Sequence, residues 1–270
     1  MFLMIDFYLN TNIYIQVLMA TFMTFSVTAL GASIVFIFKK VNQTVLDAMM
    51  GLSAGVMIAA SFWSLLEPAI SDAIGLGLNA WLITALGFIS GGLFLIISDK
   101  FFDKVLTKKN KHNNNGSIKR SLMLIFSITL HNIPEGLAVG VAFGGIALGI
   151  SGASAASAFM LAVGIAIQNF PEGCAVSLPL RRENFTRKKA FIYGALSGIV
   201  EPIAGFIGCI LAMYVKSIMP FFLSFAAGAM IYVAVSELIP ESEKNSNKSL
   251  MSFFILLGFT IMMVLDVALG

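Results

Sequence analysis

The chain has 270 residues, of which 58% are apolar and only 11% are charged, and its mean hydropathy is +0.92. A soluble domain carries roughly 25% charged residues, so this composition excludes a protein whose whole surface faces water. We expect the lipid bilayer as a partner and no nucleic acid, and the formal net charge of +3 is less informative than the positions of the basic residues. The composition predicts an all-α integral membrane protein with a single transmembrane domain over residues 1–270.

Apolar runs recur along the chain at the length that spans a ~30 Å hydrocarbon core as a helix. We predict eight transmembrane helices, at 13–38, 46–70, 80–98, 121–147, 152–180, 190–214, 218–239 and 250–269. The segment 99–120, between the third and fourth helices, is rich in Lys and Asn and lacks apolar periodicity. Such a segment is typical of a flexible loop.

The basic residues indicate the orientation of the chain. Of the 17 Lys and Arg residues, all except Lys216 lie in the connections that follow the first, third, fifth and seventh helices. Positively charged loops stay on the cytoplasmic side of a membrane. We therefore expect a multi-pass protein of the cell membrane (plasma or inner) with both termini extracytoplasmic and the loop 99–120 in the cytoplasm.

One polar pattern occurs twice within the predicted spans, as HNIPEG at 131–136 and as QNFPEG at 168–173. Residues three and four positions apart share a helix face, so the polar members of each motif project together. They are His131, Asn132 and Glu135 on the fourth helix and Gln168, Asn169 and Glu172 on the fifth. Glu201 lies at a similar depth in the sixth helix. At 1.5 Å per residue these depths are roughly 16–20 Å, which is close to the middle of the bilayer.

Carboxylates at this depth cost several kcal/mol unless they have a partner. No Lys or Arg lies in the interior of a predicted span, so protonation or a bound cation must neutralise them, and the ligand-like spacing favours a cation. Pro134 and Pro171 also each free a helix carbonyl, which a polar cavity or an ion can satisfy. Imidazole and oxygen donors without a thiolate favour a borderline divalent metal such as zinc, iron, manganese, cobalt or cadmium. Three carboxylates could hold two ions, or one ion and shared protons.

The two motifs resemble the signatures of the ZIP (Zrt-/Irt-like) family of divalent metal transporters, of prokaryotic type, and the resemblance covers essentially the whole chain. It implies that helices one to three and six to eight form an inverted repeat around helices four and five, and that the protein moves zinc or another divalent metal into the cytosol. It also implies a binuclear metal centre. The first position would use His131, Glu135, Gln168 and Glu172, and the second would use Asn132, Glu135, Asn169, Glu172 and Glu201. Some members have Asp where this chain has Asn169, which makes the second position less anionic.

The resemblance also suggests residues along the pathway. Met57 and Ser64 would line its outer part, Glu67 could collect cations at the outer mouth, and Glu237 would lie at the cytosolic exit. For Met57 and Glu67, core packing and an interfacial charge are the respective alternatives. His112 is the single histidine of the 99–120 loop, and a solvated side chain is favoured over metal sensing there.

Alternative functions remain at this stage. A proton- or other cation-coupled transporter without transition-metal specificity would need the carboxylates but not His131. An intramembrane metalloenzyme would normally need more ligands than this single membrane histidine, and HExxH is absent. We therefore expect no enzyme and no catalytic cofactor, with Zn²⁺ or another divalent ion as the bound substrate. Glycine pairs such as Gly140/Gly144 favour close helix packing within the chain, with a homodimer face as the alternative.

Overall fold

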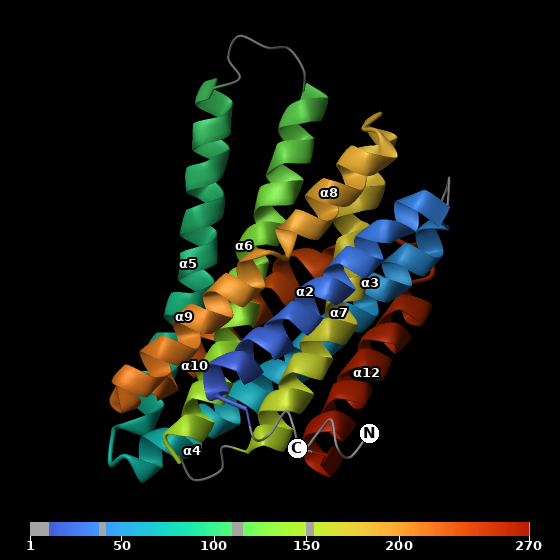
Figure 1. Ribbon diagram of the computed structural model, residues 1–270. Helices are drawn as coiled ribbons and strands as arrows, with labels where there is room; N and C mark the ends of the chain where they lie inside the picture. The colour runs from blue at the N-terminus through green and yellow to red at the C-terminus, as the bar shows by residue number, and fades with distance from the viewer. Residues whose placement is uncertain (1–10, 38–41, 110–115, 150–153, 270) are drawn as a thin grey trace.

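The computed structural model describes residues 11–37, 42–109, 116–149 and 154–269, and all regular structure in these ranges is helical (Figure 1). In chain order the helices are α2 (Ile13–Ile37), α3 (Gln43–Ala60), the π-helix η1 (Ser61–Leu66), α4 (Glu67–Gly75), α5 (Ala80–Lys109), α6 (Gly116–Ala147), α7 (Ala155–Arg182), α8 (Arg187–Ser197), α9 (Val200–Tyr214), the 3₁₀ turn η2 (Lys216–Ile218), α10 (Met219–Val233), the π-helix η3 (Ala234–Leu238), α11 (Ile239–Ser242), α12 (Lys248–Val264) and the π-helix η4 (Leu265–Leu269).

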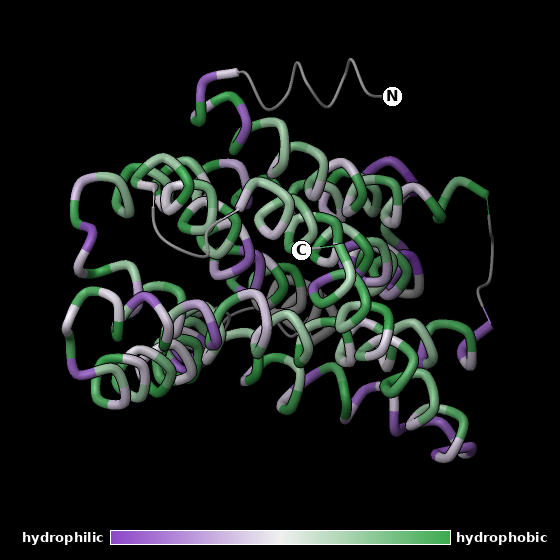
Figure 2. The backbone as a smooth tube through the Cα atoms, turned by 90° about the horizontal axis from the view of Figure 1, so that it is seen from below, coloured by the Kyte–Doolittle hydropathy of each residue, from purple (hydrophilic) through white to green (hydrophobic). Residues whose placement is uncertain are grey.

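These helices make eight passes through the bundle, as the sequence predicted. The second pass is α3, η1 and α4, the sixth is α8 and α9, the seventh runs from η2 to α11, and the eighth is α12 and η4. Seven passes are long and apolar enough to cross a membrane, and α6 is the eighth, packed against α9 and α10. The start of α2 and the end of α12 lie at one end of the bundle, and α5 and α6 extend beyond the other end (Figure 1). Seen from the end that carries the chain termini, hydrophobic residues predominate along the helices of the bundle (Figure 2).

Polar caps fix where several passes begin. The side chains of Asn42, Ser154, Thr186 and Asn247 accept hydrogen bonds from backbone N–H groups in the first turns of α3, α7, α8 and α12. A capping oxygen satisfies a donor that has no partner within the helix. These capping residues therefore mark where each of the four helices begins, at the edge of its apolar run.

The structure differs from the sequence prediction in two connections. Helix α5 continues through Lys109 and α6 begins at Gly116, so the helices extend into both ends of the segment 99–120 that was expected to be a loop. His112 lies outside the described residues. The sixth pass is interrupted at Gly198, between α8 and α9, which places Glu201 in the first turn of a new helix.

The passes pair into two groups of helices. Helix α2 packs on α7, α8 and α9, and α6 packs on α9 and α7; we call α2 and α6–α9 the ligand unit. Helix α3 packs on α12, and α5 packs on α10; we call α3–α5, α10–α12 and their π-segments the frame unit. The two units meet mainly where α3 contacts α7 and where α10 contacts α6.

Close glycine contacts show that the ligand unit has an internal repeat. A Cβ on Gly136 of α6 would lie 2.4 Å from the carbonyl oxygen of Glu201 in α9. A Cβ on Gly173 of α7 would lie 2.0 Å from the carbonyl oxygen of Thr28 in α2. Gly136 and Gly173 occupy the same position in the two PEG motifs, and Thr28 and Glu201 are 173 residues apart. The α6–α9 contact therefore corresponds to the α7–α2 contact.

The frame unit repeats in the same register. A Cβ on Gly91 of α5 would lie 1.9 Å from the carbonyl oxygen of Phe225 in α10, and a Cβ on Gly258 of α12 would lie 2.0 Å from that of Leu52 in α3. Leu52 and Phe225 have the same separation in sequence as Thr28 and Glu201. Because corresponding passes run in opposite directions, helices one to three and six to eight form the expected inverted repeat around α6 and α7.

The glycines that suggested close packing are used inside the chain. A Cβ on Gly140 would lie 2.0 Å from the carbonyl oxygen of Gly205, and one on Gly144 would lie 3.0 Å from that of Cys209. Both contacts join α6 to α9. They support the internal-packing interpretation of this glycine spacing.

Candidate metal site

The seven predicted ligands lie in the interior of the ligand unit. All are buried, with exposed fractions between 0% and 4%: His131, Asn132, Glu135, Gln168, Asn169, Glu172 and Glu201. They come from the middle of α6, the middle of α7 and the first turn of α9. We call these seven residues the midplane cluster.

Hydrogen bonds join the cluster across helices. Gln168 Nε2 donates to Glu135 Oε1 at 2.5 Å, which links α7 to α6. Asn169 Nδ2 donates to Glu201 Oε2 at 2.9 Å, which links α7 to α9. The Thr28 hydroxyl of α2 lies 3.4 Å from Glu201 Oε1 and 3.3 Å from the Thr24 carbonyl oxygen of its own helix, and the Thr24 side chain also hydrogen-bonds to Glu201. Both oxygens of Glu201 thus have protein donors.

Backbone carbonyls orient the two asparagines in the same way. Asn132 Nδ2 donates to the Ser197 carbonyl at 3.0 Å, and Asn169 Nδ2 donates to the Thr24 carbonyl at 3.3 Å. Ser197 and Thr24 are equivalent in the repeat, so the two contacts are repeat copies. The helix interruption at Gly198 leaves the Ser197 carbonyl available to Asn132, because the Glu201 N–H donates to the Gly198 carbonyl instead. With their nitrogens held by protein acceptors, the asparagine side-chain oxygens are left for another partner.

Six buried oxygens of the cluster have no hydrogen-bond donor. They are Asn132 Oδ1, Glu135 Oε2, Gln168 Oε1, Asn169 Oδ1 and both carboxylate oxygens of Glu172. An unsatisfied buried polar atom costs about 1–3 kcal/mol, and more when it is charged. So many acceptors without donors in one place make an environment suited to a cation, and the donor set of five residues with oxygen ligands and one imidazole suits a borderline divalent metal.

A second group of ligands lies where α6 meets the frame unit. His131 Nε2 is 3.0 Å from Glu237 Oε1 of η3. Asp99 of α5 lies close to both residues. One potential ligand atom from each of the three lies within 4.8 Å of the other two. We call Asp99, His131 and Glu237 the inner trio. It contains the predicted exit residue Glu237 together with Asp99, which the sequence analysis did not single out.

Two members of the inner trio, His131 and Glu237, line a cavity of about 270 Å³, which we call the His131 cavity. It extends from His131 and Glu172 of the midplane cluster to Glu183 and Glu241, at the ends of α7 and α11. These helix ends lie toward the end of the bundle where α5 and α6 extend (Figure 1). The cluster is therefore bordered by a carboxylate-lined cavity on that side.

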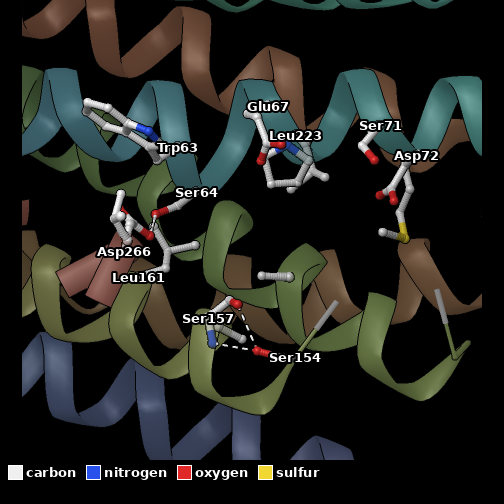
Figure 3. A pocket seen from close by; sticks show the side chains of 15 residues that line it. Trp63, Ser64, Glu67, Ser71, Asp72, Ser154, Ser157, Leu161, Leu223 and Asp266 are labelled. Carbon is white, nitrogen blue, oxygen red and sulfur yellow. Dashed lines mark hydrogen bonds between the residues drawn. The ribbon is translucent and has the colours of Figure 1, made fainter. Parts of the chain in front are cut away.

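A larger cavity of about 430 Å³ lies toward the opposite end of the bundle, and we call it the Ser64 cavity. Ser64 of η1 donates to Asp266 Oδ1 of η4 at 2.6 Å, and Glu67 and Asp72 of α4 also line the cavity (Figure 3). None of the seven cluster residues borders it. Met57 is fully buried in α3 and borders neither cavity.

The key residues of the two cavities occupy equivalent positions in the repeat. Ser64 corresponds to Glu237 in the register that relates Leu52 to Phe225. Asp99 and Asp266 have the same separation as the equivalent glycines, Gly91 and Gly258. The Ser64–Asp266 pair is therefore the inverted counterpart of the Glu237–Asp99 pair.

An inverted repeat, a buried cluster of oxygen ligands at mid-depth and a cavity on each side together define a membrane transporter for cations. Comparison with known proteins identifies the family. Residues 116–266 match the family model described as "ZIP Zinc transporter", and the chain belongs to this family of transporters, which are not enzymes.

Similar proteins occur in both animals and bacteria. The chain is 39% identical to zinc transporter ZIP11 of Bos taurus, with 94% of this chain and 97% of the relative covered. It is 35% identical to zinc transporter ZupT of Streptococcus mutans (88% and 91% covered) and 34% identical to zinc transporter ZIPB of Bordetella bronchiseptica (91% and 79% covered). The expectation of a specifically prokaryotic type is therefore too narrow for the similarity found.

Proposed function

We propose that this protein carries zinc across the membrane through the midplane cluster, with iron, manganese, cobalt and cadmium as further candidate substrates. The observation that carries the proposal is the set of six buried oxygens without donors, placed beside His131. A protein cation such as Lys or Arg would neutralise a structural cluster permanently, whereas a transported ion must be able to leave. The names of the related zinc transporters support zinc as the principal substrate.

We propose two metal positions of unequal strength. The position built from His131, Glu135, Gln168 and Glu172 keeps four oxygens without hydrogen-bond donors, in addition to the imidazole. The second position includes Glu201 and has fewer oxygens available, because both carboxylate oxygens of Glu201 already have donors, from Thr28 and Asn169. An ion there would have to displace these donors. We therefore expect the first position to bind the transported ion more tightly.

The direction of transport that we propose is into the cytosol. The distribution of basic residues supports an orientation with the Ser64 cavity on the extracytoplasmic side and the His131 cavity on the cytoplasmic side. An incoming ion would then pass Glu67 and Ser64, bind the midplane cluster, and leave past the inner trio. The described structure would be an inward-open state, since only the His131 cavity borders cluster residues.

Zinc uptake into proteoliposomes tests this proposal. We expect the wild-type protein to accumulate zinc, with competition by the other candidate metals, and His131→Ala and Glu135→Ala to lower uptake by tenfold or more, because each removes a buried ligand. Ser33→Ala is a suitable control, since this exposed hydroxyl donates to the Leu30 carbonyl of its own helix. Wild-type uptake rates in both ligand variants would refute the proposed site. Repeating the assay with and without a pH gradient would establish whether protons are coupled to transport.

A further inference from the structure

Hydroxyl groups in the described helices mostly bond to their own helix. Ser61, Ser90, Ser98, Ser224, Ser236 and Thr260, for example, each donate to a carbonyl three or four residues earlier. This is the usual local bond of a helical serine or threonine. Hydroxyls that bond to a different pass include Thr24 and Thr28 to Glu201, Ser64 to Asp266, and Ser53 to the Gln168 carbonyl.

Ser53 is distinctive because its hydrogen bond connects the two units. It lies in α3 of the frame unit, is fully buried, and donates to the Gln168 carbonyl of α7 at 3.1 Å. The side chain of Gln168 in turn donates to Glu135 of α6. The Ser53 hydroxyl therefore connects the frame unit, through one residue, to a central carboxylate of the midplane cluster.

The inverted repeat identifies the residues that correspond to this bond on the other side of the protein. Ser53 corresponds to Ala226 of α10 in the register that relates Leu52 to Phe225, and Gln168 corresponds to His131. The repeat counterpart of the Ser53–Gln168 contact would therefore pair Ala226 with His131. Because alanine has no hydroxyl, that pair cannot form the equivalent hydrogen bond.

The interfaces between the two units are equivalent in position but differ in arrangement. At the α10–α6 interface, His131 Nε2 lies 3.0 Å from Glu237 Oε1. At the α3–α7 side, Gln168 bonds to Glu135 while Ser64 bonds to Asp266. Alternating access between inverted repeats moves one unit against the other around the site, so in the opposite state each interface takes the arrangement of the other. In that state the Ser53 bond would break, and Ala226 has no hydroxyl to replace it.

From this geometry we propose that Ser53 is a positioning residue that selectively stabilises the state in which the His131 cavity borders the metal site. This inference rests on the proposed transport function. The bond contributes to one state only, so removing it shifts the equilibrium toward the state open at the Ser64 cavity. A typical net hydrogen bond corresponds to about a two- to tenfold change in the ratio of two states.

Cysteine labelling of the full chain in liposomes measures this ratio directly. Ala175→Cys reports on the His131 cavity and Ala142→Cys on the Ser64 cavity, because both alanines line these cavities. Each is labelled with a membrane-impermeant maleimide in metal-free buffer, and the rate for the chain without an added cysteine is subtracted. We expect Ser53→Ala to lower the ratio of the Ala175→Cys rate to the Ala142→Cys rate by about two- to tenfold.

Ser224→Ala is the matched control. Ser224 is also fully buried in the frame unit, but its hydroxyl donates to the Pro220 carbonyl of its own helix at 2.7 Å. We expect its labelling ratio to equal that of the unmodified background. An unchanged ratio in Ser53→Ala, or an equal shift in Ser224→Ala, would overturn the assignment. Because no metal is present, this outcome is separate from a failure of zinc uptake, which would overturn the proposed function instead.

Discussion

The Ser64 and His131 cavities occupy equivalent places in the two repeats, yet they present different chemistry to a cation. The His131 cavity has a carboxylate at Glu237, where the Ser64 cavity has a hydroxyl at Ser64. An acidic residue lies beside each of these positions, Asp99 near Glu237 and Asp266 near Ser64. An imidazole is present only in the His131 cavity, because Gln168 occupies the position of His131 in the second motif. A borderline metal binds imidazole and carboxylate more strongly than hydroxyl and amide oxygens. We therefore expect the side facing the α5–α6 end to bind the metal more strongly, although Glu67, Asp72 and Asp266 also place carboxylates in the Ser64 cavity.

The two repeats share their backbone arrangement, but they differ in side-chain chemistry at several equivalent positions. Asn132 and Asn169 make the same bond to equivalent carbonyls, of Ser197 and Thr24. By contrast, the equivalent positions Thr28 and Glu201 carry a hydroxyl and a carboxylate that bond to each other. The repeat thus provides a symmetric scaffold for movement, and substitutions at a few positions make the two sides unequal.

The largest effect is expected at Glu172, which belongs to the cluster and also borders the His131 cavity. Both of its carboxylate oxygens are buried without hydrogen-bond donors. We expect Glu172→Ala to lower zinc uptake into proteoliposomes by tenfold or more, because the ion loses a buried carboxylate ligand. Glu183→Ala, at the mouth of the same cavity, should lower uptake by less than about threefold, as expected for a partly exposed charge. Equal losses in the two variants would contradict the distinction between ligand and mouth.

Glycine contacts in the frame unit test whether the two repeats are packed equally. Gly91→Ala and Gly258→Ala would each place a Cβ within 2.0 Å of a carbonyl oxygen on the neighbouring helix. We expect each to destabilise the protein by about 1–3 kcal/mol or more, because neighbouring backbone must move. Thermal unfolding in detergent measures the effect. Gly75→Ala is the control, since nothing lies within 4 Å of its added Cβ, and a similar loss of stability there would show that the contacts are not the cause.

The sequence predicts the parts of the site that depend on short-range helix geometry. The HNIPEG and QNFPEG motifs place their polar residues on one face at i, i+3 and i+4, and the structure buries all of these residues together with Glu201. The eight passes follow from apolar run length alone. Predictions fail where a residue acts through tertiary contacts.

Asp99 and Asp266 illustrate that failure. Asp99 was assigned to the start of a loop because it follows the third apolar run and precedes Lys100, whereas α5 in fact continues past it. Asp266 lies within the predicted eighth span, and an ionisable residue there is a signal of function that could have been followed. Ser53 carries no such signal, since only the packing of α3 on α7 reveals its bond to another helix.

The inner trio allows a direct test of the stronger side. Glu237→Ala leaves Asp99 and His131 without their third member, so we expect zinc affinity measured from the His131 side to fall by about tenfold. Transport by protein of known orientation in vesicles gives this value as the zinc KM for transport that starts from the His131 side. An unchanged KM would show that the trio does not bind the ion during transport. Asp72→Ala, in the opposite cavity, is the control and should leave this KM unaltered.

The smallest effect is expected at the repeat counterpart of Glu237. Ser64→Ala removes the 2.6 Å hydrogen bond to Asp266 but leaves the carboxylate itself. We expect the zinc KM for uptake from the Ser64 side to change by only about two- to threefold, because a net hydrogen bond is worth about 0.5–1.5 kcal/mol. Ser71→Ala, which lines the same cavity without a described hydrogen bond to Asp266, serves as the control.

Ser64→Glu converts this side to the chemistry of Glu237 and is the sharper form of the same test. A second carboxylate beside Asp266 should bind zinc more tightly, since carboxylates are stronger ligands than hydroxyls for this metal. We therefore expect a lower KM for uptake together with a lower maximal rate, because an ion held more tightly in the Ser64 cavity passes more slowly to the midplane cluster. A KM equal to that of the wild type would mean that the difference between the two cavities does not lie at this position.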